Sequence, residues 1–230
     1  MPKVKIKGTI ISNDYKWIYD IFDVESTCPK DVSDILDKAN GEELDIEINS
    51  GGGDVYSGSE IYAMLKGYAG RKTVKIMGLA ASAASVIAMS GDKVMIAPTA
   101  QIMIHNVWSR RAGDYRDMEH ESEVLKNWND TTVNAYILKT GMSRDELLAM
   151  MDKETWLTPV QAKELKFADE IMFDEQRQLA AAARTAVMIP PEIINKLRNL
   201  LPRPTGNSQS TNEASVEKER LELLKLRRIY

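Results

Sequence analysis

A serine stands where a predicted strand gives way to a predicted helix, in the stretch "GLAASAAS" at residues 78–85. A serine at the first turn of a helix is exposed, and the helix N-terminus favours an oxyanion forming beside it. Ser82 is therefore the candidate nucleophile, whereas Ser85 and Ser90, further along the helix, are interpreted as packing or capping serines. The alternative interpretation of the stretch is structural, because small residues also allow helices to pack closely.

A histidine that could activate this serine ends the apolar strand candidate "AQIMIHNVW". Strand ends are where α/β enzymes hold reactive groups. The chain has two histidines, and His105 is the candidate general base, while His120, in "MEHESE", is predicted to be a solvated residue of a charged helix. A buried histidine with a structural role is the alternative for His105.

Three consecutive glycines follow a predicted strand in "INSGGGDVYSG", residues 48–58. Glycines let the backbone approach a ligand and aim N–H groups at it, as an oxyanion hole or an anion site requires. A phosphate-binding loop is disfavoured, since neither a Lys-Ser/Thr pair at the Walker spacing nor a GxGxxG pattern is present. The glycines, the serine and the histidine together indicate acyl-transfer chemistry, with an ordinary tight turn as the alternative for the glycines.

Alternating strands and helices must position these residues. Apolar and polar side chains alternate in four segments that are predicted to be strands, residues 4–10, 44–49, 72–78 and 92–98. Between two of them, residues 58–68 place apolar side chains at helical spacing. Strand, helix and strand therefore recur, which predicts an α/β fold.

Three further helices are predicted after the histidine. Residues 116–135 form a long, highly charged helix, which is expected to project from the body and pack on another subunit. Ser143 with Glu146 is a capping signal for a second helix, and Thr158 before Pro159 is one for a third. The charged helix thus separates the histidine from a smaller helical segment.

The composition indicates a globular chain with one main domain. Of 230 residues, 43% are hydrophobic and 28% are charged, which suffices for a substantial core. A net charge of −4 argues against a nucleic-acid partner. No apolar run reaches the roughly 20 residues of a membrane span, and no secretory signal pattern is present. The single cysteine, Cys28, is interpreted as structural, and a cytoplasmic location is expected.

The composition changes toward the end of the chain. A catalytic domain is expected over residues 1–176, followed by a C-terminal extension at residues 177–201. Residues 202–215 are rich in Pro, Ser, Asn and Thr and are predicted to be a polar linker. Residues 216–230 are a short, charged helix candidate.

Four separated motifs resemble the proteolytic subunit of the Clp protease family, especially its phage-encoded branch, the head maturation proteases. They are the glycine stretch, the serine stretch, "QIMIHNVW" and "ETWLTPVQAKELKFADEI", and the resemblance extends over about residues 4–173. It implies an α/β fold of the crotonase or Clp-peptidase type, a spiral of strand–strand–helix units. It also implies a projecting handle helix at about residues 116–140.

The resemblance implies roles for individual residues. It places the nucleophile on Ser82 and the general base on His105, and it implies an oxyanion hole formed by the N–H groups of Gly52 and Ala83. Where the family usually has proline in the glycine stretch, this chain has Gly51. The chemistry implied needs no metal and no other cofactor.

The acid of the implied triad departs from the family pattern. Glu154 occupies the position that is normally aspartate, and its carboxylate is one methylene further from the backbone. Asp152, two residues earlier, is the alternative acid. The carboxylate is expected to raise the pKa of His105. Activity is therefore expected to rise with pH as His105 loses its proton, with an apparent midpoint at roughly pH 6–7.5.

The leading functional prediction is a serine endopeptidase that acts through an acyl-enzyme on capsid or scaffold proteins, as a homo-oligomeric ring in the host cytoplasm of a phage. The runner-up is a housekeeping Clp-type peptidase. An unfoldase partner is not expected, because little sequence precedes the first predicted strand, where the family's unfoldase-engaging segment would lie. Two further candidates would share the fold, a crotonase-fold acyl-CoA enzyme and a ring-forming structural protein without turnover.

Overall fold

The computed structural model describes residues 1–173. The predicted extension at residues 177–201, the linker at residues 202–215 and the helix candidate at residues 216–230 lie outside the described residues, so their boundaries stay predictions. Within residues 1–173, no helix combines the length and the apolar character that crossing a membrane requires.

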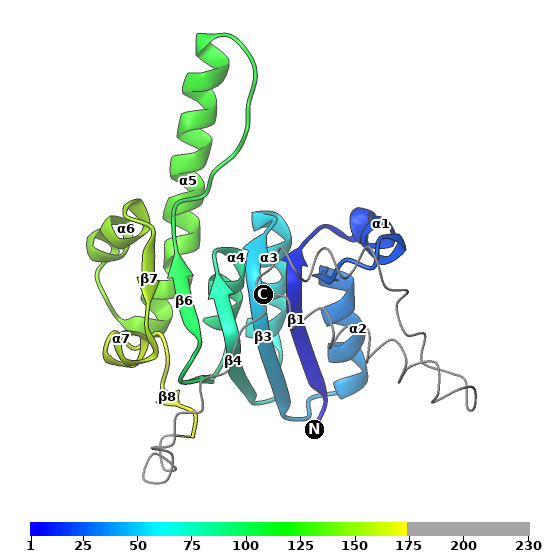
Figure 1. Cartoon of the computed structure of the whole chain (residues 1–230). Coiled ribbons are helices and arrows are strands. Elements are labelled where there is room, and N and C mark those ends of the chain that lie inside the picture. Colours follow the sequence, from blue (N-terminus) through cyan, green and yellow to red (C-terminus); the bar gives the residue numbers. More distant parts are fainter. Residues whose placement is uncertain (174–230) are drawn as a thin grey trace, which may run out of the picture. The chain divides into compact units, whose positions relative to one another are not determined.

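A largely parallel sheet forms the centre of the fold. Its strands are β1 (Lys3–Ile10), β2 (Ser26–Thr27), β3 (Leu44–Gly53), β4 (Lys72–Ala81), β5 (Lys93–Ile96), β6 (Gln101–Ile104), β7 (Thr155–Leu157) and β8 (Glu170–Ile171). The order is β2-β1-β3-β4-β5-β8, and β6 pairs with β4 and with β7. Among the strand pairs within residues 1–173, β6 and β7 alone are antiparallel (Figure 1). The predicted α/β fold is confirmed.

Helices connect and cover these strands. They are the 3-10 helix η1 (Asn13–Tyr15) and the α-helices α1 (Lys16–Ile21), α2 (Pro29–Ala39), α3 (Val55–Gly67), α4 (Ala83–Ala88), α5 (Tyr115–Thr140), α6 (Arg144–Asp152) and α7 (Pro159–Glu164). The predicted capping signals are confirmed, because Ser143 caps α6 and Thr158 caps α7.

The long charged helix is α5, with 26 residues. Asp114 caps its N-terminus, and Gly141, which has the left-handed conformation that favours glycine (φ 73), caps its C-terminus. Figure 1 shows its N-terminal half rising beyond the sheet. Its buried residues lie in the C-terminal half, where Val133 and Tyr136 join the core. The helix thus projects as predicted.

The sequence predicted that the three glycines follow a strand that ends at residue 49. In the structure they form the last part of that strand, β3. Gly52 pairs with Thr9 of β1, and Gly53 pairs with Ile10. Both glycines have positive φ, 92 and 151, and a Cβ on Gly53 would lie 2.1 Å from the Ile10 carbonyl oxygen. The absence of side chains therefore lets β3 continue to pair with β1 in a conformation that other residues rarely adopt.

The small residues of α4 pack as closely as their sizes allow. Every residue of α4 is buried. A Cβ added to Gly58 of α3 would lie 2.8 Å from the Ala83 Cβ, so the two helices meet with no room for a methyl group. The structural interpretation of the "AASAAS" stretch therefore holds for the residues that follow Ser82.

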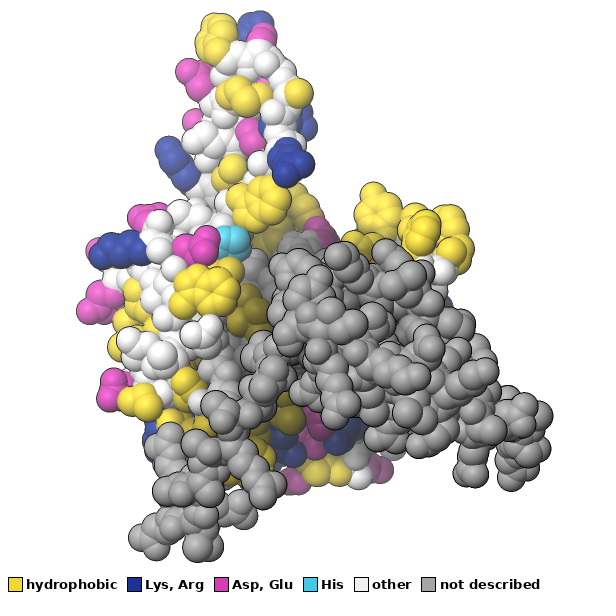
Figure 2. Space-filling model, viewed as in Figure 1, with side chains coloured by type: hydrophobic (Ala, Val, Ile, Leu, Met, Phe, Trp, Pro, Cys, Tyr) yellow, Lys and Arg dark blue, Asp and Glu magenta, His cyan; other side chains and the backbone are white. Residues whose placement is uncertain are grey.

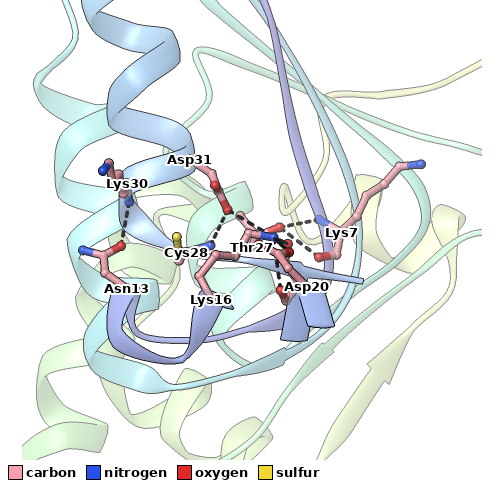
Figure 3. Close-up of polar contacts among 9 residues, drawn as sticks. Lys7, Asn13, Lys16, Asp20, Thr27, Cys28, Lys30 and Asp31 are labelled. Carbon is pink, nitrogen blue, oxygen red and sulfur yellow. Dashed lines mark hydrogen bonds and ion pairs between the residues drawn. The ribbon is translucent and has the colours of Figure 1, made fainter. Parts of the chain in front are cut away.

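The segment between β1 and α2 is fixed to the sheet by polar contacts (Figure 3). Thr27 Oγ1 accepts a hydrogen bond from the Lys7 N–H at 2.9 Å and donates one to the Lys7 carbonyl at 2.8 Å. Cys28, buried as expected of a structural cysteine, is the N-cap of α2, and its N–H donates to Asp31. This segment leaves hydrophobic side chains exposed, among them Trp17 and Phe22. Figure 2 shows a group of exposed hydrophobic side chains where Figure 1 draws α1.

Candidate active site

Ser82 lies at the sharp junction between β4 and α4. Its backbone has φ 54 and ψ −127, a conformation that costs a non-glycine residue about 1–3 kcal/mol. Its N–H donates to the Met103 carbonyl of β6 at 2.9 Å. A strained strand-to-helix turn of this kind exposes the side chain at its apex, so Ser82 Oγ faces the space above the sheet edge.

His105 follows β6 and contacts Ser82 directly. Strand β6 runs parallel to β4 with Met103 opposite Ala81, so the residues after both strands meet at one edge of the sheet. The His105 Nε2 and Ser82 Oγ atoms are 2.7 Å apart. This distance is what proton transfer from a serine to a histidine requires.

The two candidate acids lie in different surroundings. Strand β7 is antiparallel to β6 with Thr155 opposite Ile104, which brings Glu154 beside His105. The Glu154 charge acts on the His105 ring, and the Glu154 Oε1 atom accepts a bond of 3.2 Å from the Trp156 indole. Asp152 accepts a bond of 2.7 Å from the Asn106 amide instead. Among the described residues, neither carboxylate is hydrogen-bonded to His105.

The pKa of His105 lies below its ordinary value, and burial of the ring is the main cause. The negative charge of Glu154 acts in the opposite direction and raises this pKa, but by less. The sequence-based expectation of a raised pKa was therefore wrong, because it counted the carboxylate and could not count the burial. The balance of the two effects favours the neutral form of His105, which can accept a proton.

The two amides expected to form an oxyanion hole differ in their partners. Ala83 is the first residue of α4, and the first N–H groups of a helix have no partner inside it. The Gly52 N–H donates to Ser50 Oγ at 3.1 Å, and that hydroxyl donates to the Gly8 carbonyl at 2.6 Å. A Cβ on Gly52 would lie 2.7 Å from Ser82 Cβ, so this glycine is packed against the serine.

A cavity of about 860 Å³ opens at Ser82 and His105. Gly52 and Ala83 line it, as do Leu125 and Trp128 of α5. The Trp128 ring also packs edge-on against Tyr56, with ring centroids 4.8 Å apart.

Sequence reasoning missed the contribution of α5, which it treated as a charged projecting helix. The signal is a spacing of three or four residues, because positions 121, 125, 128, 132 and 136 all line the cavity and fall on one face of a helix.

A serine hydrogen-bonded to a half-buried histidine at the edge of a largely parallel sheet, at the first turn of a helix, is the arrangement of a serine hydrolase. Comparison with known proteins identifies the family. Residues 33–175 match the sequence pattern of the Clp protease family. The chain belongs to the Clp protease family and is a Clp-type serine peptidase.

Individual relatives support this membership. The chain is 31% identical to the ATP-dependent Clp protease proteolytic subunit of Deinococcus radiodurans over 147 residues, which cover 63% of this chain and 72% of that protein. It is 31% identical to proteolytic subunit 1 of Chlamydia abortus, covering 58% and 71%. A solved structure, that of a ClpP1 mutant from Listeria monocytogenes, shares the fold with a TM-score of 0.60 at 24% identity. The match covers 76% of this chain and 93% of the ClpP1 chain.

The charge balance at His105 predicts how its pKa responds to substitution. Glu154→Gln is expected to lower the pKa further, since it removes the charge that raises it. Asp152→Asn, the matched control, is expected to leave it unchanged, because burial and the Glu154 charge account for the shift of the His105 pKa and the Asp152 charge does not contribute. NMR titration of the two histidine side chains, with His120→Asn to assign them, measures both effects. A His105 pKa above its ordinary value, or one that ignores Glu154→Gln, would contradict this electrostatic account.

Proposed function

We propose that this chain is an endopeptidase that cleaves polypeptides through an acyl-enzyme on Ser82. The observation that carries the proposal is the 2.7 Å contact between Ser82 Oγ and His105 Nε2. In the first step, Oγ attacks the carbonyl carbon of the scissile bond while Nε2 accepts the hydroxyl proton. His105 then gives that proton to the departing amine as the C–N bond breaks. A water molecule, activated by His105 in turn, attacks the ester and releases the new carboxyl terminus.

Glu154 is the acid in this proposal. Its negative charge raises the pKa of His105, so it favours the imidazolium that forms when the serine gives up its proton. Asp152 is the alternative, and its bond to Asn106 argues against it.

The oxyanion in this proposal is held by the backbone. The Ala83 N–H lies at the positive end of α4, next to the attacking oxygen, and is the first donor. Gly52 is the second, and its N–H reaches an oxyanion only by sharing or giving up the bond to Ser50.

Replacing the nucleophile should remove turnover without removing the fold. Ser82→Ala is expected to reduce kcat for a fluorogenic peptide by about 10³-fold or more, the usual loss for a triad serine. His105→Asn is expected to have a similar effect, whereas His120→Asn, its matched control, should retain full activity. Ser82→Ala with wild-type turnover would refute the assignment of the nucleophile.

For the substrate, we propose capsid or scaffold proteins of a phage or prophage. The support is the likeness of the glycine, serine and histidine motifs to the phage-encoded branch of the family. The relatives named above are proteolytic subunits of ATP-dependent proteases, which favours a second candidate function, degradation of polypeptides supplied by an unfoldase.

Co-expression separates the two candidate functions. The full chain, produced with capsid and scaffold proteins from the genome that encodes it and with no unfoldase, is expected to yield discrete shortened products, and Ser82→Ala is expected to yield none. Intact capsid and scaffold proteins in this experiment, together with degradation of casein only after an unfoldase and ATP are added, would favour the second candidate.

We also propose that the chain works as a homo-oligomeric ring, with α5 packed between subunits. On its projecting part, Tyr115 is 70% and Met118 is 39% exposed, among charged side chains (Figure 2). Exposed apolar side chains on a projecting helix are typical of a surface that another protein covers. Sedimentation velocity is expected to show a closed oligomer, which the double variant Tyr115→Asp, Met118→Asp weakens. A wild-type chain that sediments as a monomer would contradict the ring.

A further inference from the structure

Two buried hydroxyl groups link the projecting helix α5 to the backbone of Ser82. Ser85, in α4, is 0% exposed, and its Oγ atom lies 2.6 Å from the Ser82 carbonyl oxygen. The same Oγ atom lies 2.7 Å from the phenolic oxygen of Tyr136 in α5, which is 2% exposed. The two hydroxyls thus form a hydrogen-bonded chain between α5 and Ser82, the residue that bears the nucleophile.

The direction of these hydrogen bonds follows from the number of protons. A carbonyl oxygen can only accept, so the Ser85 hydroxyl donates its single proton to Ser82. Ser85 Oγ can then only accept from Tyr136, whose hydroxyl must be the donor. Burial raises the pKa of Tyr136, so this hydroxyl keeps its proton at neutral pH. The chain of bonds therefore runs from Tyr136 to Ser85 to Ser82.

This chain of hydrogen bonds ends on the peptide unit between Ser82 and Ala83, whose N–H is the first proposed oxyanion donor. The Ser82 carbonyl also accepts from the N–H groups of Ser85 at 2.9 Å and Val86 at 3.3 Å, so three donors hold it. The peptide bond is planar and trans, and its N–H points opposite to its carbonyl. Whatever fixes the Ser82 carbonyl therefore also fixes the direction of the Ala83 N–H.

We propose that Ser85 and Tyr136 are positioning residues, which orient the Ser82–Ala83 peptide and so aim the Ala83 N–H at the oxyanion. This inference rests on the proposed peptidase function. It gives Ser85 a role beyond packing, since a hydrophobic residue of similar size would fill the same space without holding the carbonyl. It also makes the orientation of the Ser82–Ala83 peptide depend on the position of α5, the helix whose Leu125 and Trp128 line the cavity.

Ser85→Ala tests the proposal, with Ser90→Ala as a matched control. Ser90 is also 0% exposed and its Oγ atom donates to the Ile87 carbonyl at 2.7 Å, so the control removes the same kind of bond away from Ser82. Ser85→Ala is expected to lower kcat for a fluorogenic peptide about tenfold or more, with KM unchanged. The reason is that the hydrogen bond from the Ala83 N–H to the oxyanion forms only in the transition state. Ser90→Ala is expected to leave kcat and KM at wild-type values.

Tyr136→Phe provides a second variant that keeps the ring and its packing, 5.7 Å from the Phe167 ring. It is expected to lower kcat by a smaller factor than Ser85→Ala. The double variant is expected to be no slower than Ser85→Ala, since the phenol acts only through Ser85.

Unchanged kcat in Ser85→Ala, a loss no larger than that of Ser90→Ala, or multiplying losses in the double variant would overturn the inference. A folded wild-type chain that neither cleaves peptides nor reacts with a fluorophosphonate would instead overturn the proposed function on which it rests.

Discussion

The positive-φ backbone of Ser82 is the constraint on which the site depends. It is unfavourable for a residue with a side chain, so the surroundings must supply what holds it. The N–H is bound to β6, the carbonyl is bound within α4 and by Ser85, and Gly52 of β3 packs against the side chain with no space for a Cβ. Three elements thus fix one residue, and this explains why the residues around it are so small.

The electrostatics of the site combine two opposing effects on one imidazole. Burial disfavours the charged form of His105 and so favours the neutral ring, which can accept a proton. Glu154 favours the charged form, which becomes important only after the proton has moved. Glu154, which directly precedes β7, has a positive φ of its own (49), so a second unfavourable backbone conformation lies beside the site.

The sequence predicted the local features well. Strand alternation, the helix caps at Ser143 and Thr158, and the candidate positions Ser82 and His105 each follow from signals within a few residues. The sequence could not predict contacts between distant segments. Ser50 bonds to Gly8, 42 positions away, and thereby occupies the Gly52 N–H, and Ser85 meets Tyr136, 51 positions away. The extension of β3 through its glycines was missed for the same reason, because it depends on pairing with β1.

The central claim is that Ser82 is the residue that becomes acylated. Mass spectrometry of the full chain after reaction with diisopropyl fluorophosphate tests it most directly, since the reagent marks an activated serine covalently. The account predicts one adduct per chain, located by peptide fragmentation on Ser82. An adduct on another serine, such as Ser85, or a folded chain that carries no adduct, would contradict it.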